Sequence, residues 1–324
     1  MLAPSSRPDP DQVAHLRARV VAELPAIDAA AREITRLGAD LPPTTVRVVG
    51  RTAWVRANLE VIAGALEPLR VRLEERPTVS RRVLGLQLGA LLGLLSTKVL
   101  GQFVLPLAGP GTGQLLVVGP NVLSLAEEHG EVADDIRRTV VLHEITHRLQ
   151  FDGNPWLGDH LRGLVGRYLE HTRVDGNQLA AIAPKLPAAI AEAKATGELR
   201  PLLETVLSDE QVEVVDEAQG LMSLLEGHGN ATMYGAPPAV VGDPERVRAA
   251  LASRQGDITS KVLTAVAGLE LKRRQYREGE VFVRAVLDEA GTEGLNLAFA
   301  APGNLPRGRE ITDPAGWIAR VTAP

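Results

Sequence analysis

The spacing of apolar side chains along the chain predicts a mainly helical protein. Between residues 11 and 38, apolar residues such as Val13, Leu16 and Val20 recur at intervals of three and four, which places them on one face of an α-helix. The expected fold class is therefore mainly α with a small β element. Further helices are expected over residues 54–73, 81–100, 131–151, 156–169, 187–196, 208–226, 245–251 and 258–281.

Two short apolar runs predict the β element. Val46–Val49 is expected to form a short strand or an extended entry to the next helix. Gln114–Val118, which is flanked by glycine and proline, is the strongest strand candidate. Because this run precedes the segment that carries the candidate chemistry, it can be the sheet edge that pairs with an extended peptide substrate. An ordinary core strand is the favoured interpretation of the two.

Repeated glycines mark two regions of the chain. The first is Val83–Thr97, a run of fifteen residues without a charged side chain, which is too short for a bilayer span of about 20 residues. Gly85, Gly89 and Gly93 recur every four residues along it. We therefore expect a buried helix whose glycines let a second helix approach closely.

The second glycine-rich region follows a helix that begins at Ser208. Ser208 and Gln211 have the spacing of a capping box, in which a hydroxyl and an amide side chain satisfy backbone groups of the first turn. The helix is expected to run to about Glu226. Gly227 and Gly229 then predict a loop.

The composition narrows the possible chemistry. The chain has 324 residues and no cysteine, which excludes disulfide scaffolds, thiolate zinc sites, iron–sulfur clusters and cysteine nucleophiles. A net charge of −5 and only ten aromatic residues (three Trp, three Tyr and four Phe) argue against a nucleic-acid partner. The N-terminus lacks the apolar stretch of a signal peptide, so we expect a cytoplasmic protein with no membrane partner.

The length suggests about two domains. A change of composition near residue 105 separates an N-terminal helical region, residues 1–105, from a region that holds the candidate chemistry, residues 106–324. The two regions can also form one integrated domain, because no linker, internal repeat or low-complexity tract marks a sharper boundary.

The HEITH segment at residues 143–147 carries the candidate chemistry. On a helix, His143 and His147 lie one turn apart on the same side, so both imidazoles can bind one metal ion. The metal lowers the pKa of a water molecule bound to it. Glu144 is placed to take a proton from this water and to deliver that proton to a leaving group. The apolar residues on either side of the motif favour the helix that this chemistry requires. The pattern therefore predicts a catalytic zinc site.

Such a site needs a third protein ligand and an open fourth position. Without cysteine, the third ligand must be His, Asp or Glu. Two glutamates are candidates: Glu170, which follows His147 by 23 residues, and Glu226, which shares an otherwise inward-facing helix side with Met222. Because a buried carboxylate is costly unless it is paired or bound to metal, the residues favour Glu226 and leave Glu170 as the alternative.

Several further blocks accompany HEITH in order along the chain: Val99–Gln102, Leu142–Phe151, Pro155–Leu157, Met222–His228, Leu271–Glu280, Leu295–Asn296 and Trp317–Arg320. In this order they resemble the zincin-like metallopeptidase type 2 family, bacterial hydrolases of which some are labelled as associated with deazaflavin-coenzyme biosynthesis. The resemblance extends from about residue 45 onward, and the Glu-Gly-His and Arg-Gln-Tyr blocks are its most specific parts outside HEITH. It implies a zincin-like metalloprotease fold and makes Glu226 the expected third ligand.

Other residues are candidates for supporting roles around the zinc. His228 and Tyr276 can donate a hydrogen bond to the oxyanion of the transition state. A metal-bound histidine usually donates its other ring N–H to a carboxylate or carbonyl, and Asp152, Asp216 and Glu217 are the candidates for that partner.

The leading hypothesis is a cytoplasmic, zinc-dependent metallohydrolase that acts on a peptide or small amide substrate. In this hypothesis His143, His147 and Glu226 hold the zinc, and Glu144 is the general base. The alternative is a non-catalytic zincin-fold binding or regulatory protein that retains a structural metal site. An open fourth position on the metal favours an enzyme, whereas a fourth protein ligand such as His228 favours a structural metal.

Overall fold

The computed structural model describes residues 9–67, 78–105, 113–171, 204–252 and 272–323, with a few positions between 172 and 203. The chain forms two compact units, each built from two segments. The first comprises Met1–Gly158 and Gly229–Ile258, and the second comprises Asp159–His228 and Thr259–Pro324. The boundary expected near residue 105 stays a prediction.

The helices and strands agree with the mainly helical class that the sequence predicts. Most of the expected helix over residues 187–196 and most of the one over 258–281 lie outside the described residues. The principal elements are α1 (Pro10–Thr35), β1 (Val46–Val49), α2 (Arg51–Leu66), α4 (Thr78–Ser96), β2 (Gly101–Val104), β3 (Gln114–Val118), α5 (Gly119–Glu128), α6 (Ala133–Asp152), α7 (Pro155–Glu170), α11 (Asp209–Tyr234), α13 (Lys272–Asn296) and α14 (Pro314–Thr322).

The first unit contains a three-stranded sheet in the order β1-β3-β2. β1 runs parallel to β3, with Val46 opposite Leu115. β2 runs antiparallel to β3, with Phe103 opposite Leu115. β3 is therefore the central strand, which confirms the core-strand interpretation of Gln114–Val118 and excludes the edge-strand interpretation. The edge next to the candidate motif is β2, which the sequence pattern missed.

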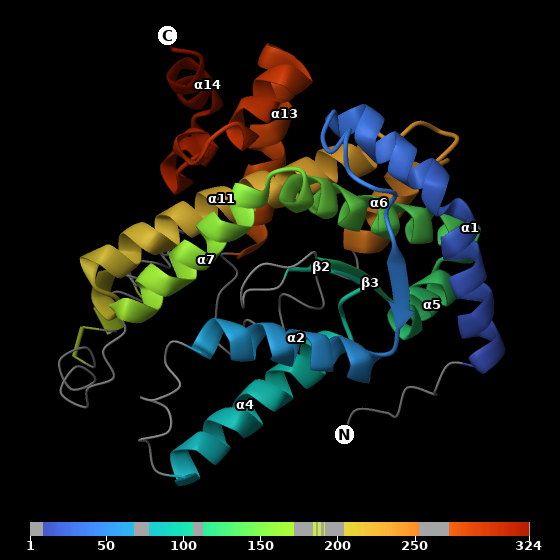
Figure 1. Ribbon diagram of the computed structural model, residues 1–324, viewed down its shortest axis with the longest axis horizontal. Helices are drawn as coiled ribbons and strands as arrows, with labels where there is room; N and C mark the ends of the chain where they lie inside the picture. The colour runs from blue at the N-terminus through green and yellow to red at the C-terminus, as the bar shows by residue number, and fades with distance from the viewer. Residues whose placement is uncertain are drawn as a thin grey trace. The chain divides into compact units, whose positions relative to one another are not determined.

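Side chains of β3 alternate between two cores, one on each face of the sheet. Leu115 and Val117 join the core formed with α1, α5 and α6. Leu116 and Val118 join a smaller core with Trp54 of α2 and with α4. Figure 1 shows α6 and α2 on opposite sides of the sheet. Burial on both faces explains why Gln114–Val118 is almost continuously apolar.

The prediction of a buried helix over residues 81–100 is wrong, because α4 covers the sheet with only one side. Leu92 is buried against the smaller core. Leu86, in contrast, is 74% exposed. Gly85, Gly89 and Gly93 are also exposed, and a Cβ added at any of them would meet nothing within 4 Å in the described structure. None of the helices in the described part of the chain has both the length and the apolar character to cross a membrane.

The capping box at the start of α11 is confirmed. The Ser208 N–H donates to Gln211 Oε1 at 3.1 Å, and the Gln211 N–H donates to Ser208 Oγ at 3.3 Å. The predicted end of this helix is wrong, because α11 continues through Gly227 and Gly229 to Tyr234. In the second unit, the backbone of Gly279 on α13 lies where a Cβ of residue 227 would be. Gly227 therefore allows close helix packing where the sequence suggested a loop.

The second unit has its own aromatic core. Trp317 of α14 is fully buried and lies edge-on to Phe282 of α13, with ring centroids 5.4 Å apart. Its indole N–H donates to the backbone carbonyl of Asn304 at 2.8 Å. The buried indole is therefore satisfied, and it fixes the C-terminal helix to α13.

Candidate metal centre

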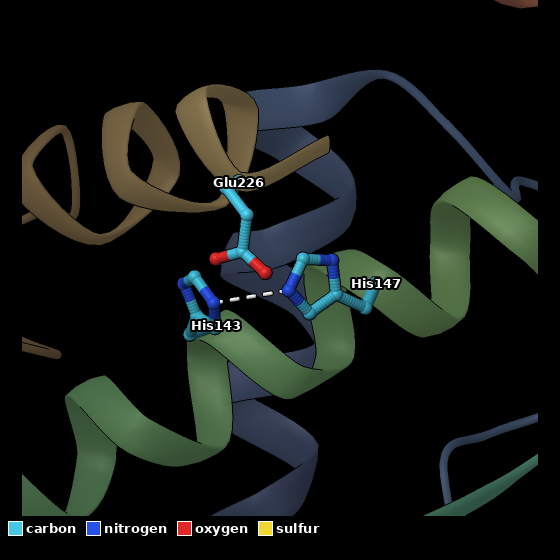
Figure 2. Close-up of side chains that lie close together, drawn as sticks. All are labelled: His143, His147 and Glu226. Atoms are coloured by element: carbon cyan, nitrogen blue, oxygen red, sulfur yellow. Dashed lines mark hydrogen bonds between the residues drawn. The ribbon is translucent and has the colours of Figure 1, made fainter. Parts of the chain in front are cut away.

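His143 and His147 lie one turn apart on α6, as their spacing predicts. Their Nε2 atoms are 3.0 Å apart. Glu226 on α11 completes a group in which one ligand atom from each residue lies within 4.8 Å of the others. Figure 2 shows the Glu226 carboxylate pointing toward the two imidazole rings. All three side chains are half-buried.

Gln150 orients the ring of His147. Its Oε1 lies 2.9 Å from His147 Nδ1. An amide oxygen can only accept a hydrogen bond, so Nδ1 carries the proton and Nε2 presents a lone pair toward His143. Gln150 is completely buried. Sequence reasoning missed this residue, although its position three residues after His147, on the same side of the helix, is a signal that could have found it.

The predicted carboxylate partners of the histidines have other contacts. Asp152 accepts a hydrogen bond from Arg148 at 3.2 Å. Glu217 pairs with Arg167. Asp216 lies against Gly308, where a side chain on residue 308 would collide with it. These three acidic residues were the expected partners of a metal-ligand histidine. For His147, the partner in the structure is Gln150 instead.

Gly229 brings α11 close to the ring of His143. A Cβ at residue 229 would lie 2.7 Å from His143 Cε1 and 2.8 Å from Nδ1, closer than real Cβ contacts come. Only glycine lets the helix backbone pass here without moving the imidazole. Because Glu226 precedes Gly229 by three residues on the same helix, this close approach also sets the distance at which the Glu226 carboxylate reaches the histidines.

Glu144 is held in place by the edge strand. Its side chain is buried, and Oε2 accepts a hydrogen bond from the backbone N–H of Phe103 on β2 at 2.8 Å. The neighbouring Gly101 touches the same side chain, because a Cβ there would lie 2.7 Å from Glu144 Cγ. The carboxylate between His143 and His147 in sequence is thus fixed by protein contacts, as a general base would need to be.

The N-terminal end of α6 is tied to α1 by an ion-pair network. The buried Arg137 donates to Glu23 at 2.7 Å and to Asp134 at 2.7 Å. Burial opposes the ionisation of Glu23, but hydrogen bonds and positive charge from Arg137 and Arg138 outweigh it and lower the pKa of this carboxyl. The charges therefore stabilise the packing of α6 against α1, which keeps the motif helix in place.

The C-terminal end of α6 is fixed by Arg148, the residue after His147. Its guanidinium donates to Thr44 Oγ1 at 2.6 Å and to the backbone carbonyl of Pro42 at 2.8 Å. Burial raises the pKa of Asp152, and the nearby Arg148 offsets part of this rise. Because both ends of α6 are anchored, the side chains of the two histidines extend from a helix that is fixed in position.

Comparison with known proteins agrees with this geometry. The family model for zincin-like metallopeptidases matches residues 1–318. The chain belongs to this family. A crystal structure from Chloroflexus aurantiacus, described as "a putative hydrolase with a novel fold", is similar to it with a TM-score of 0.70 and 27% sequence identity, over 95% of this chain and 90% of that one. Comparison with curated proteins gives no match.

The remaining predicted residues are not members of the ligand group found among the described residues. Glu170 is exposed at the last residue of α7, and the ligand group contains Glu226 instead. His228 is 3% exposed and packs on Phe299, with ring centroids 5.7 Å apart. Two residues along a helix correspond to about 200°, so His228 and Glu226 point to opposite sides of α11. Tyr276 is on α13, but its side chain lies outside the described part of the structure.

The donors of this zincin-like centre fit a zinc ion. Two imidazole nitrogens and one carboxylate oxygen form one of the usual catalytic zinc ligand sets. Tetrahedral bonds of about 2.1 Å bring ligand atoms to about 3.4 Å from one another, and the three atoms here already lie within 4.8 Å. Small side-chain rotations are therefore enough to bind the ion.

Proposed function

We propose that this protein is a zinc-dependent metallohydrolase that cleaves a peptide or small amide bond. One observation carries the proposal: the half-buried His143, His147 and Glu226 converge, and the buried carboxylate of Glu144 lies on the same helix as the two histidines. A structural zinc is normally enclosed by four protein ligands. Three partly exposed ligands, as found among the described residues, instead favour a position that is open to water and substrate.

Zinc in this site would polarise the substrate carbonyl and lower the pKa of a water molecule. The chain supplies the remaining functions. His143, His147 and Glu226 hold the ion, with the His147 ring oriented by Gln150. Glu144 takes the proton of the attacking water and delivers it to the leaving amine. Its contact with Phe103 limits the movement of the carboxylate between the two transfers.

The outer edge of β2, which pairs with no other strand in the described part of the chain, supports a peptide as the substrate class. The Val118 N–H donates to the Leu100 carbonyl at 2.8 Å. In an antiparallel pair the bonding residues alternate, so the backbone groups of Gly101 and Phe103 point away from β3. The Phe103 N–H is taken by Glu144, but the carbonyls on that side can pair with an extended chain. The substrate-binding role considered for Gln114–Val118 is therefore proposed for β2.

The test combines metal analysis with hydrolysis of a fluorescence-quenched peptide library. We expect about one zinc per chain in the purified protein, and its loss in His143→Ala. Glu144→Gln should retain zinc, whereas kcat should fall by at least about 100-fold because the general base is lost. Glu170→Gln is the matched control and should change neither. Full activity in Glu144→Gln would contradict the mechanism.

The same experiment distinguishes the non-catalytic alternative. If the protein binds zinc but cleaves no library member, the visible spectrum of the cobalt-substituted protein reports the coordination. Four protein ligands would identify a structural metal and refute the hydrolase. We expect instead a spectrum that changes when a small anion such as azide is added, because an open position can accept an external ligand.

A further inference from the structure

The edge strand β2 contacts Glu144 at two adjacent outward positions. The Phe103 N–H donates to Oε2 at 2.8 Å. At Gly101 a Cβ would lie 2.7 Å from Glu144 Cγ, 3.0 Å from Oε1 and 3.0 Å from Val140 Cγ1. Residues 101 and 103 are two positions apart on the strand, so their side-chain positions lie on the same face of the sheet, the face that α6 covers. The Glu144 side chain therefore lies directly against the strand backbone, in the space that a side chain at residue 101 would fill.

The strand cannot easily move away from Glu144. On its opposite face, Gln102 and Asn58 of α2 form a reciprocal amide pair, with both N–O distances 3.0 Å. Asn58 also donates to the backbone carbonyl of Trp54 at 2.9 Å. On its inner side β2 is paired with the central strand β3. A side chain added at residue 101 would consequently move Glu144, which can rotate, rather than the strand.

We propose that Gly101 is a positioning residue for Glu144. Without a side chain at residue 101, the carboxylate reaches the Phe103 N–H, and this contact fixes its position relative to His143 and His147. The positioning follows from the contacts themselves, whereas its catalytic consequence rests on the proposed hydrolase function. Gly101 is not among the residues with positive φ, so alanine can adopt the same backbone conformation. The effect of Gly101→Ala should therefore come from the added methyl group.

The first experiment measures the environment of the Phe103 amide, without using activity. In the zinc-loaded wild type this outward N–H should be protected from hydrogen exchange by the Glu144 carboxylate. In Gly101→Ala its exchange should be at least about tenfold faster, and Glu144→Ala should have the same effect. Gly89→Ala is the matched control: it adds the same methyl group where nothing lies within 4 Å among the described residues, and it should leave the exchange unchanged.

The second experiment separates positioning from metal binding. Gly101→Ala should keep about one zinc per chain and the cobalt spectrum of the wild type, because the contacts of His143, His147 and Glu226 are not touched. With a cleavable library peptide, kcat should fall by about 100-fold, while KM stays within about twofold. A general structural defect would instead change the zinc content or the cobalt spectrum together with kcat.

A backbone substitution keeps the proposal testable if Gly101→Ala does not fold. Replacing the Phe103 amide with an ester, by incorporating phenyllactate, removes the N–H, keeps the ring and makes the Gln102 carbonyl a weaker acceptor. Because this N–H does not pair with β3, no sheet hydrogen bond is removed, and the one accepted by the Gln102 carbonyl is only weakened. We expect the same fall in kcat with zinc retained.

Unchanged exchange at Phe103 in Gly101→Ala, or unchanged kcat in a folded Gly101→Ala or ester variant, would overturn the positioning role. If the wild type cleaves no peptide, the proposed function fails, but the exchange experiment still decides whether Gly101 positions Glu144.

Discussion

The repeated glycines of α4 and α11 have different surroundings. On α4, Gly85, Gly89 and Gly93 are exposed, and an added Cβ at each would meet nothing within 4 Å in the described structure. On α11, the space beside Gly227 is filled by the Gly279 backbone and the space beside Gly229 by the His143 ring. Close packing therefore occurs at Gly227 and Gly229, not at the regularly spaced glycines of α4.

The spacing of glycines along a helix therefore does not predict by itself whether they lie in a close contact. The packing partner must also be known. A four-residue repeat places the α4 glycines on one side of the helix, but the apolar core is centred on the adjacent side, where Leu88, Leu92 and Leu95 pack. On α11, helix continuity is kept through Gly227 and Gly229 despite their poor helix propensity, roughly 1 kcal/mol each relative to alanine. Contacts that only glycine allows offset this cost.

Adding a methyl group at residue 227 should produce the largest effect on stability. Its Cβ would overlap the carbonyl oxygen of Gly279, a backbone atom that cannot rotate away. We expect Gly227→Ala to lower the free energy of unfolding by about 3 kcal/mol, because overpacking outweighs the gain in helix propensity. Urea denaturation measures the change. Gly163→Ala on α7, which meets nothing within 4 Å among the described residues, is the control in the same unit. Equal stability of the two variants would refute the close packing.

Adding a methyl group at residue 229 should instead weaken metal binding. The atoms in its way belong to the His143 ring, which can rotate, so the fold should tolerate Gly229→Ala. The displaced ring would no longer present its nitrogen beside His147, and we expect zinc affinity to fall by about 10- to 100-fold, or about 1.4–2.7 kcal/mol. Competition with a chromogenic chelator measures the affinity, and a urea midpoint close to that of the wild type shows that the fold is intact. Wild-type affinity in a folded variant would show that Gly229 does not limit the approach of α11.

Local signals were sufficient for much of the fold and of the site. The HEITH helix, the capping box at Ser208 and the strand Gln114–Val118 are each defined by residues that are neighbours in sequence. The residues also favoured Glu226, which lies in the ligand group, but the premise that its side of α11 faces inward is wrong, because Met222 on that side is 45% exposed. These features depend on periodicity and side-chain type, which the sequence contains directly.

Features that depend on distant partners were not predictable in the same way. β2 has only Phe103 and Val104 as apolar residues, and it is a strand because it pairs with β3 and donates to Glu144. The continuation of α11 past Gly227 depends on a second glycine, Gly279, more than 50 residues away in the sequence. No local pattern reports that two such positions meet in space.

The smallest effect is expected on α4, and its sign tests the comparison most directly. Gly89→Ala adds a methyl group to an exposed helix position with nothing within 4 Å in the described structure. Alanine restricts the unfolded chain and favours helix, so the variant should be more stable by about 0.5–1 kcal/mol. Urea denaturation measures this gain, with Gly85→Ala as an independent repeat on the same side of the helix. If another helix packed on these glycines, as their spacing suggested, both variants would be destabilised by overpacking. A loss of stability in both would therefore mean that α4 has a close partner in solution, and that the glycines of α4 and α11 have the same role.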